Sequence, residues 1–314
     1  MKRTFALSLL AALAASAVAV RPAHAQAPEA GPPKIIHKPN PHEIGLAPPT
    51  GGTSPTSPIL YHGGPVIATP TVYLVWYGNW NQANGSDTPA GQQIVRDFAK
   101  SVGGSPYFDI NASYNGVTGG VTVPTTQSET TDAYSQGSRI RDSDVQKIVV
   151  RAISSGKLPY DPDGVYFVLT SSDVSERSGF CTRYCGWHTA ATPSVGHIRY
   201  SFVGNANRCL NACAAQTVGP NGNAGVDGMV SVIAHELEET TTDPDLNAWY
   251  DGSGAENADK CAWTFGHAQY QVANGAWANT ALGTRDFLIQ RNLDHSIAGP
   301  NGVADYCMVS PTQN

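Results

Sequence analysis

Runs of strand-forming residues alternate with helix-like segments through the middle of the chain, and this alternation constrains the fold more than any other feature of the sequence. Three runs rich in β-branched and aromatic residues have the composition of buried strands and cover 71–77, 164–169 and 198–203. Apolar residues recur at helical spacing over 88–100, 142–153 and 229–241. A further short strand is expected at 120–125. Alternating strands and helices predict an α/β fold, here one domain with a mixed, partly parallel sheet.

Residues 1–25 have the features of a secretory signal peptide. Lys2 and Arg3 precede an apolar run from Phe5 to Val20, and Ala23-His24-Ala25 has the form of a cleavage site. The segment contains three basic residues and no acid, so its removal leaves 16 basic and 25 acidic residues and a formal charge of −9. This charge argues against a nucleic-acid partner, and the sequence offers no later run long enough for membrane insertion. We expect a secreted protein, extracellular or periplasmic.

The six cysteines follow the signal-like segment, at 181, 185, 209, 213, 261 and 307. In an exported chain an even number of cysteines predicts disulfide-stapled loops. The two C-x3-C spacings suggest the local pairs Cys181–Cys185 and Cys209–Cys213, which leaves Cys261–Cys307 to cross-link the C-terminal segment. The alternative is a zinc cluster of four thiolates.

Residues 26–58 contain nine of the 22 prolines and few apolar side chains. Such a segment buries too little surface to offset the entropy lost on ordering, so we interpret it as a Pro-rich linker or tail. The folded α/β domain is then expected over 59–314, which is long enough for one substantial core.

The segment from Gly228 to Pro244 contains the residues most indicative of chemistry, His235-Glu-Leu-Glu-Glu239. His235 and Glu239 are four residues apart, so a helix projects both from one side, where they can share an ion. The pattern is the H-E-x-x-H motif of zinc hydrolases with Glu in place of the second His. In that motif the outer residues hold zinc and the intervening Glu accepts a proton from water. We therefore predict a zincin-like helix in which His235 and Glu239 bind metal and Glu236 is catalytic.

A zinc site needs a third protein ligand, and three downstream acids are candidates. We rank Glu256 first, because an acid from a second downstream segment resembles the gluzincin arrangement, then Asp259, then Asp243. Zinc is the expected cofactor, although a site with two carboxylates also suits calcium or manganese. The alternative is that these acids form a solvated helix face. The apolar stretch 229–234 argues against it, since carboxylates beside buried residues need partners.

Three further residues are candidates for lining a substrate site. His62 lies in the glycine-containing segment 61–65, for which a turn before the first strand is the simpler interpretation. Trp187 and His188 follow the paired cysteines 181 and 185, and they either contact a ligand or pack beneath a disulfide. His188 or His267 would also suit the stabilisation of a tetrahedral intermediate.

Six segments carry distinctive motifs, in chain order Tyr61-His-Gly-Gly-Pro65, Val75-Trp-Tyr-Gly-Asn-Trp80, Leu169-Thr-Ser-Ser-Asp-Val174, Gly179 to His188 with its two cysteines, Val203-Gly-Asn205 and Gly225-Val-Asp-Gly-Met229. Taken together, these segments resemble the EXORDIUM, or phosphate-induced protein, family. The resemblance extends from about residue 59 to the C-terminus and implies an extracellular protein, with no catalytic residue to transfer. We expect the H-E-x-x-E helix to differ from that of plant members, for which the resemblance implies small and apolar residues.

Two functions are consistent with these features. The first is a secreted EXORDIUM-like protein with a metal site that acts as a zinc-dependent peptidase or hydrolase. The second is a non-catalytic protein that binds an extracellular polymer or associates with a cell wall, and that holds at most a structural ion. Replacement of Glu236 by Gln distinguishes them, because only the first function depends on a proton acceptor at that position.

Overall fold

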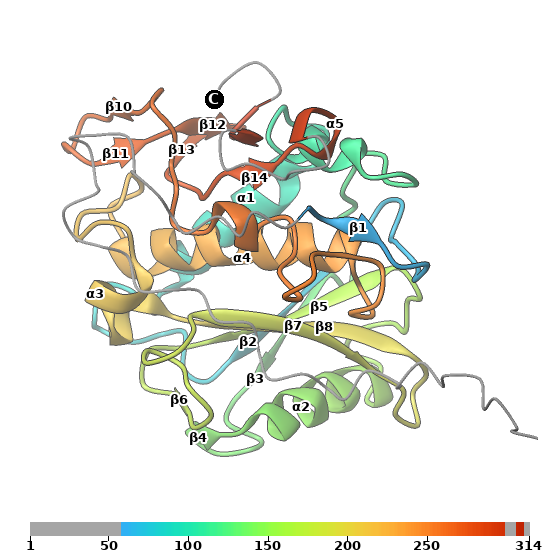
Figure 1. Cartoon of the computed structure of the whole chain (residues 1–314). Helices are drawn as coiled ribbons and strands as arrows, with labels where there is room; N and C mark the ends of the chain where they lie inside the picture. Colours follow the sequence, from blue (N-terminus) through green and yellow to red (C-terminus); the bar gives the residue numbers. More distant parts are fainter. Residues whose placement is uncertain (1–57, 299–305, 311–314) are drawn as a thin grey trace, which may run out of the picture.

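The computed structural model describes residues 58–298 and 306–310. The signal-like segment 1–25 lies outside the described residues, as does the Pro-rich segment 26–58 apart from Pro58. A five-stranded sheet crosses the molecule, with α2 (Asp142–Ser154) on one face and α1 (Pro89–Val102) and α4 (Ala224–Thr242) on the other (Figure 1). The C-terminal hairpins lie beyond α1 and α4, so α4 is enclosed between the sheet and the last third of the chain (Figure 1).

The main sheet has the strand order β3-β2-β5-β8-β7. Its strands are β2 (Thr71–Tyr77), β3 (Glu129–Asp132), β5 (Gly164–Thr170), β7 (Gly186–Ala191) and β8 (Ile198–Gly204). All neighbouring strands are parallel except β7, which runs antiparallel to β8 at one edge. The expected α/β fold with a mixed, partly parallel sheet is therefore confirmed.

The three apolar runs form the central strands β2, β5 and β8 as predicted, because each is buried along almost its whole length. The two edge strands were not predicted, since β3 is polar and half-exposed and β7 begins with glycine. The expected strand at 120–125 is wrong. Thr122 forms only an isolated bridge with Thr71, and the adjacent valines pack at the margin of the core.

The three predicted helices are present; α1 and α2 begin within one residue of the predicted positions, and α4 begins earlier. Thr88 caps α1, its hydroxyl accepting a hydrogen bond from the Gly91 amide at 3.0 Å. Asp142 is the first residue of α2, and the amide of the preceding Arg141 donates a hydrogen bond to the Asp144 carboxylate at 3.0 Å. Helix α4 begins at Ala224, five residues before the predicted Met229, because Asn223 caps it through the Val226 amide.

Short elements complete the described part of the chain. The helical ones are η1 (Phe108–Ser113), η2 (Ala206–Arg208), α3 (Leu210–Cys213), η3 (Asp259–Cys261) and α5 (His295–Ala298). The paired strands are β1 (Leu60–Tyr61) with β9 (Trp249–Tyr250), β4 (Arg139–Ile140) with β6 (Ser175–Glu176), β10 (Tyr270–Gln271) with β11 (Trp277–Ala278), β12 (Thr280–Leu282) with β13 (Arg285–Phe287), and β14 (Asn292–Leu293) with β15 (Cys307–Met308).

Helix α4 is buried around its whole circumference from Gly225 to Thr242. Its first turns can approach α3 and η2 because Gly228 has no side chain; a Cβ there would lie 2.8 Å from the Cys213 carbonyl oxygen. At the other end Thr240, Thr241 and Thr242 bond their hydroxyls to carbonyl oxygens one turn earlier, which satisfies these polar groups internally. The helix thus carries its acidic residues into the interior of the protein.

The disulfides differ from the predicted local pairs. Cys181 is bonded to Cys209 and Cys185 to Cys213, whereas Cys261–Cys307 is as predicted. The predicted pairs Cys181–Cys185 and Cys209–Cys213 are wrong because the two C-x3-C segments lie side by side, and each cysteine faces its counterpart in the other segment. The pairing excludes the zinc–thiolate alternative, since every cysteine is in a disulfide. Cys185 directly precedes β7, so its disulfide fixes the start of that edge strand.

We expect the double variant Cys185→Ala/Cys213→Ala to lose about 3–4 kcal/mol of unfolding free energy, the value for closing a loop of this length. Urea unfolding of the purified protein measures this loss. The variant Cys181→Ala/Cys209→Ala is the matched control, because its cysteines have the same sequence separation of 28. An unchanged urea midpoint in the first variant would show that other contacts hold β7 in place.

Among the residues that the structure describes, we find no helix with the length and apolar character needed to cross a bilayer.

Candidate metal centre

His235 and Glu239 project from the same side of α4, as their spacing predicts. The Nε2 atom of His235 lies 3.1 Å from Oε1 of Glu239, and both residues are fully buried. Despite this separation the two atoms do not form a hydrogen bond, and neither ring nitrogen of His235 has a hydrogen-bond partner. The two groups are therefore close enough for an ion pair but are not hydrogen-bonded to each other.

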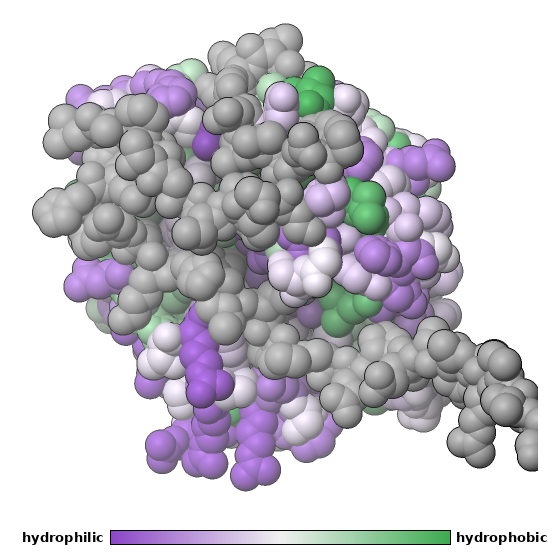
Figure 2. Space-filling model, in the orientation of Figure 1, coloured by the Kyte–Doolittle hydropathy of each residue, from purple (hydrophilic) through white to green (hydrophobic). Residues whose placement is uncertain are grey.

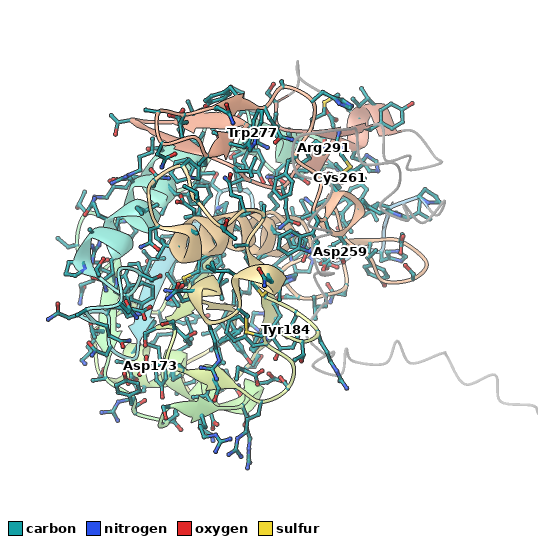
Figure 3. All side chains as sticks on the ribbon, turned by 90° about the vertical axis from the view of Figure 1, so that its left-hand side faces the viewer. Asp173, Tyr184, Asp259, Cys261, Trp277 and Arg291 are labelled. Atoms are coloured by element: carbon teal, nitrogen blue, oxygen red, sulfur yellow. A yellow bond between two sulfur atoms is a disulfide. The ribbon has the colours of Figure 1, made fainter. Side chains whose placement is uncertain are left out.

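A loop after α4 brings two of the three predicted third ligands to the cluster. Asp259 begins η3 beside α4 (Figure 3), with Oδ1 3.6 Å from His235 Nε2. Its amide donates a hydrogen bond to Glu239 Oε1 at 3.1 Å, which orients that carboxylate. Glu256 reaches a different part of the cluster, with Oε1 3.6 Å from Nε2 of His188. The geometry around His235 therefore favours Asp259 over the first-ranked Glu256.

His188 enters the cluster from the edge strand β7. Its Nδ1 lies 3.4 Å from Oε2 of Glu236 and 3.5 Å from Oε2 of Glu239. This approach depends on Gly186, two residues earlier on the same face of the strand. A Cβ at Gly186 would lie 2.5 Å from a methyl group of Val232 and 3.2 Å from Glu236 Oε1, so any side chain there would push α4 away from β7.

Two groups of residues have the composition and spacing of a metal centre. Each consists of one histidine and two carboxylates whose ligand atoms lie within 4.8 Å of one another, namely His235, Glu239 and Asp259, and His188, Glu236 and Glu239. Ligands at 2.0–2.2 Å from a tetrahedral zinc are about 3.3–3.6 Å apart. The histidine–carboxylate separations of 3.1–3.6 Å lie close to that range. The donor set therefore fits a divalent ion.

The electrostatics of the cluster also favour a cation. Within the described ranges, Glu236 and Glu239 form ion pairs with histidines and with no lysine or arginine. Buried carboxylates cost several kcal/mol each unless a nearby positive charge, such as a protonated histidine or a bound cation, compensates them. A dication between them would remove this cost, and nitrogen and oxygen donors are the ligands that zinc accepts.

The two glutamates have pKa values displaced in opposite directions. Burial raises the pKa of Glu236 to about 7, although the nearby His188 lowers it. Burial acts in the same direction on Glu239, but His235 and His188 hold its pKa below the usual value. Opposite displacements of this kind suit different roles: Glu239 stays ionised, and Glu236 can gain and lose a proton.

The histidines respond to the same charges. Burial lowers the pKa of His235, but Glu239 and Asp259 outweigh it and raise the pKa well above the usual range. For His188, burial again lowers the pKa, and Glu256 and Glu236 raise it well above the usual range. Both imidazoles therefore lie in a strongly negative environment that attracts a cation.

The remaining acids of the helix lie outside the two groups. Asp243, the lowest-ranked third ligand, ends α4 and accepts hydrogen bonds from the amides of Asn247 and Ala248, both at 2.6 Å. Burial and the nearby Glu256 raise its pKa to about 8. Glu238 is buried next to Tyr107, and burial raises its pKa well above the usual value. Asp243 thus shapes the turn after the helix.

The other predicted contact residues are placed away from the cluster. Trp187 points to the opposite face of β7 from His188 and packs in the core against Phe202. His62 directly follows β1 and stacks on Tyr250 of β9 with ring centroids 3.7 Å apart, beside the small β1–β9 sheet that closes the turn after α4. His267 is exposed, with no contact to the cluster among the described residues. Of the residues predicted to line a substrate site, the structure brings only His188 to the acids.

Sequence reasoning did not identify His188 as a potential metal ligand. Only its position could have indicated this role: Gly186 and His188 lie on the same face of a strand that directly follows Cys185. That signal is weak without knowledge of the sheet, because β7 lacks the apolar alternation typical of a strand.

The fold and the cluster together define a class of protein: a disulfide-bonded α/β domain whose buried central helix presents histidine and carboxylates to an edge strand. The chain belongs to the phosphate-induced protein 1 family, because the conserved region of that family matches residues 59–287. Two similar proteins from Arabidopsis thaliana are Protein EXORDIUM-like 3, 31% identical over 80% of this chain and 86% of its own length, and Protein EXORDIUM-like 5, 32% identical over 68% and 67%. Protein PHOSPHATE-INDUCED 1 of Nicotiana tabacum is 26% identical over 68% and 74%.

No solved structure matches the chain. The expected family is therefore confirmed by sequence, whereas the expected difference from the plant helix stays a prediction.

Proposed function

We propose that this protein is a secreted, zinc-dependent hydrolase of peptides, in which His235, Glu239 and Asp259 hold the ion and Glu236 is the general base. One observation carries the proposal: the Nε2 atom of His235 lies 3.1 Å from Glu239 and 3.6 Å from Asp259 but has no hydrogen-bond partner. The three ligand atoms all lie within 4.8 Å of one another, which is compatible with ligands of one metal ion. Export is supported by the three disulfides, which are typical of oxidising compartments.

Each residue has a separate task in this reaction. When bound, the zinc ion supplies Lewis acidity toward the substrate carbonyl and toward water. Glu236 accepts a proton from the attacking water and later returns it to the leaving amine, the usual cycle of a general base. His188 Nδ1 lies 3.4 Å from Glu236 Oε2 and so orients that carboxylate. The Nε2 atom of His188 has no hydrogen bond and is available to stabilise negative charge on the substrate oxygen.

Substrate would approach from the side of Asp259. The side chain of Asp259 is 15% exposed, whereas the side chains of His188, His235, Glu236 and Glu239 are 0–1% exposed. The reacting groups are therefore shielded from bulk water, which strengthens every electrostatic interaction between them.

The first test is the metal content of the full secreted chain. After reconstitution with zinc and dialysis against metal-free buffer, we expect about one equivalent of zinc in the parent protein and none in His235→Ala/Glu239→Ala, because the site needs both ligands. Elemental analysis measures the content, and a thermal melt measures the accompanying stabilisation. A parent protein without zinc, and with a melting temperature equal to that of the double variant, would rule out the proposal.

A matched pair of variants identifies the third ligand. Asp259→Asn is expected to weaken zinc binding by more than about 100-fold, the upper range for loss of a supporting group. Glu256→Gln removes an acid from the same loop that contacts His188 rather than His235, so we expect a smaller effect. Zinc affinity that fell only in Glu256→Gln would assign the third ligand to Glu256 instead.

A second candidate function, non-catalytic binding of an extracellular polymer, is favoured by one surface feature. Leu60 and Tyr61 of β1 are 56% and 53% exposed, beside the stacked rings of His62 and Tyr250. Exposed aromatic side chains suit contacts with a polymer. Elsewhere the coloured surface in Figure 2 is mostly polar, with isolated apolar spots. Binding of wall polysaccharide that is lost in Tyr61→Ala and kept in His235→Ala/Glu239→Ala would support this function.

A further inference from the structure

The carboxylate of Glu239 is divided between the two histidines. Its Oε1 atom faces His235, 3.1 Å away, and accepts the amide hydrogen bond of Asp259. Its Oε2 atom faces His188, 3.5 Å from Nδ1, and has no hydrogen-bond partner although the residue is fully buried. A carboxylate that presents one oxygen to each of two nitrogen donors has the arrangement of a bridging ligand.

A second set of ligand atoms surrounds the unpaired oxygen. His188 Nδ1 lies 3.4 Å from Glu236 Oε2 and 3.5 Å from Glu239 Oε2, and all three atoms lie within 4.8 Å of one another. These separations again match the ligand spacing of about 3.3–3.6 Å around a tetrahedral ion. This set shares only Glu239 with the set around His235.

We propose that a second divalent ion binds between His188, Glu236 and Glu239, that Glu239 bridges the two ions, and that occupation of this second site switches the hydrolase off. The inference rests on the proposed function, because inhibition follows from the assignment of Glu236 as general base. A carboxylate bound to a cation cannot also accept the proton of the attacking water. The residues of the site would thus limit activity when the metal concentration is high.

The negative charge of the cluster favours binding of two ions, and repulsion between the ions makes one bind more weakly than the other. Four carboxylates surround the histidines, those of Glu236, Glu239, Glu256 and Asp259. Two dications carry as much positive charge as four carboxylates can carry negative charge, whereas one dication balances only two of them. The second ion binds more weakly than the first, because two like charges about 3.5–4 Å apart repel each other. Inhibition is accordingly expected only after the first site is filled.

Titration of the metal-free full chain with zinc tests the proposal by calorimetry and elemental analysis. We expect two binding events in the parent protein, with about two equivalents of zinc at saturation, as in other two-metal sites. In His188→Ala and in Glu236→Gln the second event disappears and the first remains. Glu238→Gln is the matched control, because Glu238 is a buried acid of the same helix turn that contacts neither histidine of the cluster in the described ion pairs, and it should keep both events.

The outcomes separate this inference from the proposed function. A single event in the parent protein would overturn the second site and leave the first intact. No event would overturn both. Two events in the parent that persist in both His188→Ala and Glu236→Gln would place the weaker ion elsewhere, for example at an exposed histidine such as His267, and would overturn the assignment. As a second readout, excess zinc should inhibit peptide hydrolysis by the parent at the concentration that fills the second event, and should not inhibit residual activity of His188→Ala.

Discussion

Glu236→Gln should abolish peptide hydrolysis while the protein stays folded and keeps one equivalent of zinc. The substitution preserves the size of a side chain that is fully buried between α4 and β7. It removes the only group in the proposed mechanism that accepts a proton from water, and general-base catalysis contributes about 10²–10⁴-fold to such rates. Mass spectrometry of a peptide library after incubation with each protein measures the loss, and elemental analysis measures the zinc.

Glu238→Gln provides the control for this prediction. Glu238 lies two residues away on the same buried helix, beside Tyr107, and forms no ion pair with either histidine among the described residues. Its substitution should therefore leave hydrolysis unchanged. If Glu236→Gln cleaved the library as fast as the parent protein, Glu236 could not be the base, and the non-catalytic binding function would become the better interpretation of the fold.

Gly186→Ala should destabilise the fold and weaken zinc binding together. The added Cβ would lie 2.5 Å from Val232 and 2.9 Å from the Phe202 carbonyl oxygen, closer than carbon atoms pack in proteins. Overpacking of this kind costs about 1–3 kcal/mol of unfolding free energy. Relief of the clash moves α4 away from β7, and metal sites lose affinity when their ligands shift by a fraction of an ångström. Thermal unfolding with and without zinc measures both effects.

Ala191→Ser is the matched variant for this experiment. It makes a similarly small change on the same strand, at a half-buried position on the face opposite His188. Its melting temperature should stay close to that of the parent protein, and so should the increase in melting temperature on addition of zinc. Equal behaviour of Gly186→Ala and Ala191→Ser would mean that the spacing of α4 and β7 does not control the site.

The sequence predicted the structure best where the residues of a single helix or strand are enough to determine it. The buried strands β2, β5 and β8 follow from their apolar composition, and the proximity of His235 to Glu239 follows from helical geometry alone. Prediction failed where the local structure depends on how two segments of the chain pack against each other. The glycines at 225 and 228 indicate a loop by composition, but they lie within α4 because the helix packs tightly against η2 and α3.

The same limit applies to the candidate site. Asp259 and Glu256 were predicted from their position after the helix, but only the loop geometry assigns one to His235 and the other to His188. His188 itself depends on the antiparallel pairing of β7 with β8, which no local pattern reveals. The cysteine pairs likewise depend on which two segments lie side by side.

The pairing of β1 with β9 has a consequence for how the protein folds. Leu60 pairs with Tyr250 and the amide of Ile67 bonds to the Thr241 carbonyl oxygen, so the first described strand closes the turn that leads from α4 to Glu256 and Asp259. Contacts between residues so distant along the chain form slowly, because a large loop must close first. The acidic loop should therefore be ordered late in folding, once residues 60–67 and 241–250 have come together. Loading with metal would then be confined to the compartment in which the protein completes its folding.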